Sequence, residues 1–107
     1  MNKQIIFEQV KNVTSQLITK YKPEKIILYG SIPKGRSHKD SDIDILVIKD
    51  TKDHPIRRIQ SVSRLIDRKI AFDFIVMTPR ELDERLTLGD FFFHDILKNG
   101  KVLYEKN

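Results

Sequence analysis

The sequence contains no cysteine, and this absence excludes several kinds of chemistry. Without thiols there is no disulfide, no thiolate zinc site and no cysteine nucleophile. The spacing of the three histidines does not predict a zinc site either. No apolar stretch approaches the roughly 20 residues of a transmembrane helix, and the first residues lack the apolar segment of a signal peptide. We therefore expect a cytoplasmic protein that does not enter the membrane.

Length and charge limit the remaining possibilities. A chain of 107 residues, 33% of them charged, is typical of one soluble domain, which we expect to span residues 1–107. The net charge of +5 is compatible with a polyanionic partner. However, the basic residues are spread along the chain, and our first interpretation is that they form an ordinary solvent-exposed surface. No basic helix with interleaved aromatic residues is present, so nucleic acid is the weakest hypothesis for the main partner.

Apolar periodicity and capping residues predict helices and strands in alternation. Thr78-Pro79-Arg80-Glu81 is a capping box with proline at the first helical position, and Asp90 is expected to cap a last helix. The residues of Phe91-Phe92-Phe93 are expected to divide between the core and its rim, with contact to a partner as the alternative. The basic residues Arg57, Arg58, Arg64 and Arg68 read as the solvated face of a helix. The expected helices cover residues 3–20, 55–67, 79 onward and 91–99, and the expected strands cover residues 25–29, 43–48, 69–77 and 102–104.

This order predicts an α/β (α+β) fold in which helices pack on a small mixed β-sheet. Strand directions cannot be read from the pattern. In the helix over residues 55–67, the expected apolar stripe consists of Ile56, Ile59, Val62, Leu65 and Ile66.

The most informative stretch is YGSIPKGRSHKDSDIDILVI, residues 29–48. Gly30-Ser31 forms a turn after one apolar run, and Ser31 is expected to cap a short helix. Ten residues later, Asp42 and Asp44 open a second apolar run. Carboxylates at positions i and i+2 of a strand point to the same face. A turn that offers N–H groups to phosphate, together with paired carboxylates that hold Mg²⁺, indicates nucleotide chemistry.

A third carboxylate, Asp73, stands among apolar residues of the strand expected over residues 69–77. A charge in such a place is costly unless it is paired or binds a metal ion. Alternatively, Asp73 lies at an edge of the sheet in contact with water, or pairs with an arginine. Three neighbouring carboxylates stay ionised together only around a cation, for which Mg²⁺ is the first candidate and Mn²⁺ the second; otherwise one of them takes up a proton.

The pattern GS-x10-DxD, with Gly35 inside it and Ser41 before the first acid, resembles the nucleotidyltransferase fold of the DNA polymerase beta superfamily. More narrowly, the chain resembles the minimal nucleotidyltransferases, from about Tyr21 to Tyr104, including the ending ILKNGKVLYE. The resemblance implies a sheet of the polymerase-palm type and a third aspartate at the place of Asp73. Many relatives carry arginines after Gly-Ser, where this chain keeps a positive charge only at Lys34. The resulting site prediction assigns catalysis and metal binding to Asp42, Asp44 and Asp73, and nucleotide binding to Gly30, Ser31, Lys34 and Ser41.

The implied activity is a Mg²⁺-dependent transfer of a nucleoside monophosphate, AMP from ATP by expectation, to a hydroxyl group. Small members of the family are often paired with a helical HEPN-domain protein in toxin–antitoxin systems, where the nucleotidyltransferase is the antitoxin and in some cases adenylylates a tyrosine of the toxin. The alternative is a binding module that neutralises such a partner by contact, without catalysis. The nucleotide, the acceptor and the oligomeric state are not determined by the sequence.

Overall fold

The computed structural model of the protein describes residues 3–30 and 42–107. Within these ranges, no helix is long and apolar enough to cross a membrane. The elements follow the chain in this order: α1 (Lys3–Gln16), a π-helical turn η1 (Leu17–Tyr21), β1 (Lys25–Tyr29), β2 (Ile43–Ile48), α2 (Pro55–Leu65), β3 (Phe72–Met77), α3 (Pro79–Thr87), α4 (Phe91–Asn99) and β4 (Lys101–Glu105).

The four strands form one mixed sheet in the order β3-β2-β1-β4. Strand β1 pairs antiparallel with both of its neighbours, whereas β2 and β3 pair in parallel. The parallel pair needs a crossover, and α2 supplies it. A bulge interrupts the pairing of β1 with β4 between Ile26 and Ile27. The prediction of a mixed sheet with packed helices is confirmed.

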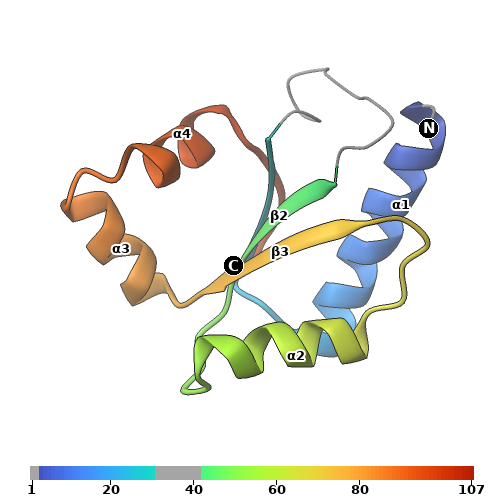
Figure 1. The fold of residues 1–107 in the computed structure, drawn as a ribbon, viewed down its shortest axis with the longest axis horizontal. Helices are drawn as coiled ribbons and strands as arrows, with labels where there is room; N and C mark the ends of the chain where they lie inside the picture. The colour runs from blue at the N-terminus through green and yellow to red at the C-terminus, as the bar shows by residue number, and fades with distance from the viewer. Residues whose placement is uncertain (1–2, 31–41) are drawn as a thin grey trace.

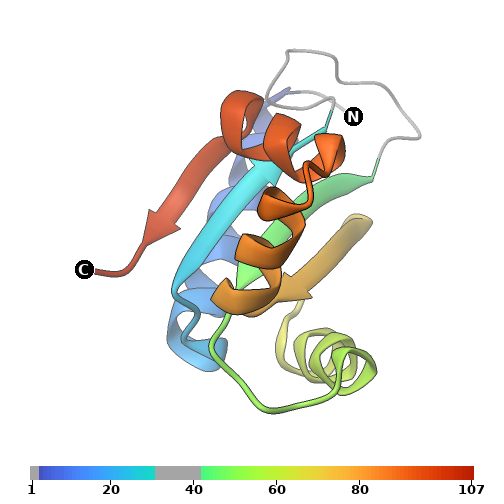
Figure 2. The same ribbon diagram turned by 90° about the vertical axis from the view of Figure 1, so that its left-hand side faces the viewer.

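Helices cover both faces of the sheet, as Figures 1 and 2 show. Alternate residues of each strand enter two separate apolar clusters, as the period of two in a strand requires. On one face, Ile43, Ile45 and Val47 of β2 pack with residues of α1 and α2. On the other face, Leu46 and Ile48 pack with residues of α3 and α4. The face to which a strand residue points therefore decides which helices it contacts.

The predicted helix starts are present as local hydrogen bonds. The capping box of α3 is complete, because Thr78 accepts from the Glu81 N–H and Glu81 accepts from the Thr78 N–H. The carboxylate of Asp90 accepts from the backbone at the start of α4, and His54 accepts from the Ile56 N–H at the start of α2.

Two predicted boundaries between residues 65 and 72 differ from the structure. Helix α2 ends at Leu65, and β3 begins at Phe72 instead of Lys69. Side chains of α1 hold the intervening backbone. Gln16 exchanges two hydrogen bonds with the backbone of Asp67, and Gln9 accepts from the Lys69 N–H at 3.0 Å. These contacts between distant segments prevent the strand from starting earlier.

The prediction that Arg58 lies on a solvated helix face is wrong. Its side chain is buried and donates to both carboxylate oxygens of Glu81, at 2.7 and 3.3 Å. It also donates to the carbonyl oxygens of Asp53 and Val76. Because Arg58 takes this inward position, the start of the expected apolar stripe is turned outward, and Ile56 is 64% exposed. The rest of the stripe is confirmed only in part, since Val62 and Ile66 are buried and Leu65 is half-buried, whereas Ile59 is 39% exposed.

Candidate active site

The acids of β2 and β3 meet at the same level of the sheet. Asp44 is the register partner of Tyr29 in β1 on one side and of Asp73 in β3 on the other. All three belong to the alternate set of strand residues that faces α3 and α4, because Ile27, Leu46 and Ile75 of the same set pack there. We call Tyr29, Asp44 and Asp73 the acid row.

Asp44, at the centre of the acid row, is half-buried, whereas Asp73 is exposed on the outer strand. Burial is the largest cause that raises the pKa of the Asp44 carboxyl, and the negative charges of Asp73 and then Asp42 raise it further. The three predicted acids therefore act on one another electrostatically. Asp42 lies exposed just before β2, and its negative charge contributes to the raised pKa of Asp44.

Tyr29 is a member of the acid row that the sequence analysis did not identify. It is 8% exposed, and burial together with the charges of Asp44 and Asp73 raises the pKa of its phenol well above the ordinary value. Its ring meets the ring of Phe92 edge-on, with centroids 5.8 Å apart. Phe92 is about half exposed, so α4 borders the acid row with an aromatic ring that is open to solvent. In the sequence, its position directly before Gly30 was the only indication that Tyr29 belongs to the site. Nothing in the sequence indicated its contact with Phe92.

Gly30 follows the acid row directly and has a positive φ of 84°. A Cβ at this position would collide with the carboxylate of Asp44. Glycine is therefore required both by the backbone conformation and by the close approach of an acid. The predicted nucleotide-binding residues Ser31, Lys34 and Ser41 lie outside the described residues.

The donor set suits a divalent cation, since carboxylate oxygens are the ligands that Mg²⁺ prefers. Burial is the largest cause of the raised pKa of Asp44, and the charges of Asp73 and Asp42 raise it further; a cation would relieve the repulsion among these carboxylates. Among residues 3–30 and 42–107, however, no three His, Cys, Asp or Glu side chains lie together in the arrangement of a finished metal site. In the structure, Asp44 and Asp73 share one level of the sheet and Asp42 precedes it, without forming a closed ligand cage.

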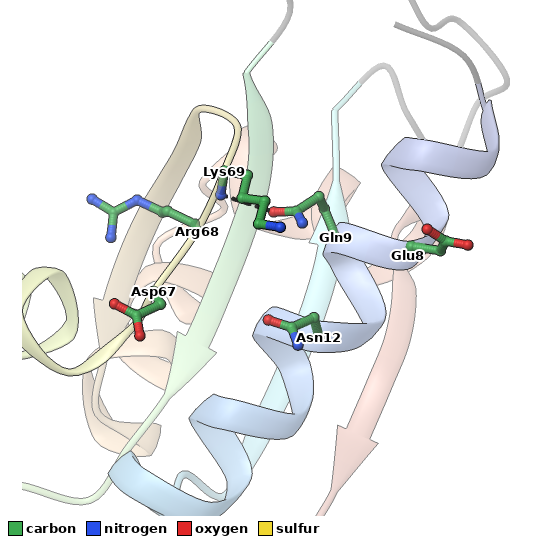
Figure 3. A pocket seen from close by; sticks show the side chains of 6 residues that line it. All are labelled: Glu8, Gln9, Asn12, Asp67, Arg68 and Lys69. Carbon is green, nitrogen blue, oxygen red and sulfur yellow. Dashed lines mark hydrogen bonds between the residues drawn. The ribbon is translucent and has the colours of Figure 1, made fainter.

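A separate polar groove lies on the side of the sheet that carries α1, between this helix and the segment that joins α2 to β3 (Figure 3). Its volume is about 370 Å³, and the hydrogen bond between Gln9 and the Lys69 backbone crosses it. Because the acid row faces α3 and α4, this groove is not part of it. The groove is lined by Glu8, Gln9, Asn12, Asp67, Arg68 and Lys69.

The same architecture occurs in a solved structure. The crystal structure of a candidate nucleotidyltransferase from Sulfolobus solfataricus superimposes with a TM-score of 0.59, at 22% sequence identity, over 99% of this chain and 91% of the other. This similarity shows that the two chains share the same fold.

Residues 8–107 match the family model described as "Polymerase beta, Nucleotidyltransferase". The chain therefore belongs to the polymerase beta-like nucleotidyltransferase family, a class of enzymes that its motif already resembled. A relative from Methanocaldococcus jannaschii, named as a candidate protein adenylyltransferase, is 30% identical over 98 residues. The alignment covers 89% of this chain and 94% of that relative.

Proposed function

We propose that this protein is a Mg²⁺-dependent adenylyltransferase that transfers AMP from ATP to a hydroxyl group of a protein. The observation that carries the proposal is the register of Asp44 with Asp73 on one face of a nucleotidyltransferase sheet. The similarity to a relative named for protein adenylylation supports ATP as the nucleotide and a protein as the acceptor. We also propose that residues 1–107 act as a single catalytic domain.

In the proposed reaction, the acceptor oxygen attacks the α-phosphorus of ATP. The bond from this phosphorus to the oxygen that bridges to the β-phosphorus breaks, and pyrophosphate leaves. The carboxylate of Asp73 accepts the hydroxyl proton, a role that fits its exposed place on the outer strand. Asp44 and Asp42 supply the remaining negative charge of the site. Gly30 allows the Asp44 carboxylate to lie against the backbone of the turn, where any side chain would collide with it.

Asp42, Asp44 and Asp73 would hold the divalent cation, with Mn²⁺ as a substitute for Mg²⁺. When bound, the cation neutralises phosphate charge and helps to ionise the acceptor hydroxyl. The exposure of Asp42 and Asp73 leaves coordination positions for water and phosphate oxygens, which Mg²⁺ usually keeps. Ser31, Lys34 and Ser41 remain the proposed contacts to the triphosphate.

The finer biological role follows from the resemblance to minimal nucleotidyltransferases. We propose that the chain is the antitoxin of a two-component pair and that a helical HEPN-type protein is both its partner and its acceptor. The ring of Phe92, which contacts Tyr29 of the acid row, and the exposed ring of Phe91 that precedes it in α4 would give such a partner an apolar surface. A non-catalytic binder would use this surface alone.

Intact-mass analysis separates catalysis from binding. The purified protein is incubated with ATP, Mg²⁺ and a helical HEPN-type protein as the candidate partner, and the partner is expected to gain one AMP. Asp73→Asn should abolish the gain, whereas Asp83→Asn, which removes an exposed charge of α3, should preserve it. A partner that binds with unchanged mass, in the presence of either metal ion, would establish the non-catalytic alternative.

A further inference from the structure

Strand β3 forms one edge of the sheet, and the acid row ends at this edge. The strand order places β2 on its inner side, no described strand pairs with its outer edge, and α2 lies beside its far end (Figure 2). Asp73, near the start of β3, is exposed at this edge. The catalytic side of the sheet therefore ends in an open strand.

The backbone groups that point away from the sheet can be assigned from the parallel pairing. The Ile43 N–H donates to the Ala71 carbonyl, and the Lys49 N–H donates to the Met77 carbonyl. In a parallel ladder, alternate residues bond to the same neighbour, so Asp73 and Ile75 also bond inward to β2. The N–H and C=O groups of the intervening residues, Phe72, Phe74 and Val76, consequently point outward.

Only part of this outer edge is already occupied. Arg58 donates to the Val76 carbonyl at 3.3 Å and so covers the far end of the strand. Among the described residues, none forms a hydrogen bond with the outward backbone groups of Phe72 or Phe74. The open part of the edge thus extends from Phe72 to Phe74, with Asp73 at its centre.

The opposite edge of the sheet, formed by β4, is better protected against the addition of another strand. Strand β4 is bulged at its pairing with β1, and it begins with Lys101 and ends with Glu105. Bulges and charged side chains are common devices against the addition of another strand. In β3, the only charged side chain is Asp73 itself. The two edges therefore differ at the place where the acid row is located.

We propose that the outer edge of β3 binds an extended segment of the acceptor protein as an additional antiparallel strand, with a hydroxyl-bearing residue opposite Asp73. This inference rests on the proposed adenylyltransferase function. Because the backbone of Asp73 bonds inward, the residue opposite it forms a non-hydrogen-bonded pair, with Cα atoms about 4.5 Å apart. Its side chain lies on the same face as Asp73, with Cβ atoms separated by about 4.5–5.5 Å. The added residue extends the acid row by one position.

The chemistry of the edge selects this occupant. An apolar side chain opposite Asp73 would desolvate the carboxylate without a hydrogen bond, which is unfavourable. A second copy of this chain, paired over the same residues, would bring two Asp73 carboxylates directly opposite each other, which is also unfavourable. A hydroxyl donates a hydrogen bond to the carboxylate and is the group that the reaction consumes. Its proton passes to Asp73 as its oxygen bonds to the α-phosphorus and pyrophosphate departs.

The chain offers a matched pair of variants for a test. Phe72→Pro removes an outward N–H and leaves the inward bonds of β3 intact, and proline is tolerated at the first residue of an edge strand. Phe72→Ala removes the same ring but keeps the N–H. The probe is a pool of nonapeptides of alternating valine and polar residues, with Ser, Thr or Tyr at the centre. A second pool is N-methylated at the two residues that flank the centre.

Each protein is incubated with ATP, Mg²⁺ and one of the two peptide pools. The amount of AMP attached to the peptides is measured by mass spectrometry and divided by the total amount of ATP converted to pyrophosphate. For the wild type, the unmethylated pool should be modified at least fivefold more than the methylated pool, as expected for lost backbone hydrogen bonds. The ratio of peptide modification to ATP conversion should be at least fivefold lower in Phe72→Pro than in Phe72→Ala. Thermal melting tests whether both variants are folded. If Phe72→Pro is not folded, the comparison of the two peptide pools on the wild type decides whether the peptide binds as a strand.

Equal modification of the two pools, or no modified peptide while ATP is converted, would overturn the proposed strand addition and leave the proposed function standing. Sedimentation provides a further check. A wild-type dimer that Phe72→Pro dissociates and Phe72→Ala does not would assign the edge to a second copy and would also overturn the inference. If the wild type converts no ATP under any condition, the proposed function itself fails, which is a distinguishable result.

Discussion

Substitution of Gly30 by alanine tests whether the turn and the acid row depend on each other. Gly30 and Gly89 both have positive φ angles, 84° and 76°, so alanine is strained at either position. Their surroundings differ. A Cβ at Gly89 meets no atom within 4 Å, whereas a Cβ at Gly30 collides with the carboxylate of Asp44. Gly89→Ala is therefore a control that introduces the same backbone strain without a collision with a carboxylate.

The magnitudes follow from these two contributions. The left-handed conformation should cost each alanine variant about 1–2 kcal/mol of the free energy of unfolding. In Gly30→Ala, the carboxylate of Asp44 must also turn away, and an off-rotamer side chain costs about 0.5–1.5 kcal/mol more. This second contribution is moderate because the carboxylate is the end of a side chain and can rotate. The larger consequence should be functional, since the rotated carboxylate leaves the position from which it is proposed to hold the divalent cation.

Urea unfolding of the two single variants measures the difference, and the double variant Gly30→Ala/Asp44→Ala completes the comparison. Removal of the Asp44 carboxylate should relieve the collision, so the two substitutions should be less destabilising together than the sum of their separate effects. Mg²⁺-dependent ATP binding, measured calorimetrically on folded protein, should be lost in Gly30→Ala and retained in Gly89→Ala. Equal losses of stability in the two single variants, with ATP binding intact in both, would refute the contact between Gly30 and Asp44.

Three further predictions concern charge. Because the pKa of Asp44 is raised in the folded state, the folded protein binds its proton more tightly than the unfolded chain, and ionised Asp44 destabilises the fold at neutral pH. Asp44→Asn should therefore raise the metal-free stability at pH 7 in urea unfolding, and the gain should vanish as the pH falls toward the ordinary aspartate pKa of about 3.9; a constant gain would contradict the electrostatic cause. Arg58→Met should lower the free energy of unfolding by about 2–3 kcal/mol, since it removes the buried guanidinium that pairs with the half-exposed Glu81 carboxylate and donates to the Val76 carbonyl, whereas Arg80→Met on the surface should cost less than about 1 kcal/mol. Similar losses would show that burial of Arg58 is unimportant. Mg²⁺ with ATP at 100 times the Kd should stabilise the protein by about 2.7 kcal/mol in a melting experiment. Asp44→Asn should remove this stabilisation and Asp83→Asn should not, and an equal response of both would rule out the acid row as the metal site.

Strands and helix starts were predictable because their signals are local. The strands at residues 25–29 and 43–48 have the predicted limits, since each is a short apolar run between turn residues. The capping box at Thr78 and the cap at Asp90 also formed as predicted, because each involves groups within three residues of one another. For the same reason, the spacing of Asp42 and Asp44 was sufficient to propose an acidic site.

The tertiary structure decided what depends on residues distant in the chain. The pairing of β2 with β3 places Asp73 beside Asp44, and strand direction and register follow from the way the whole sheet packs. The partner of Arg58 lies 23 residues away, so its helix alone gave no reason to expect burial. The contact of Tyr29 with Phe92 likewise joins the first strand of the fold to the last helix. Local patterns therefore determined which residues form each element, whereas packing determined the neighbours of each charge.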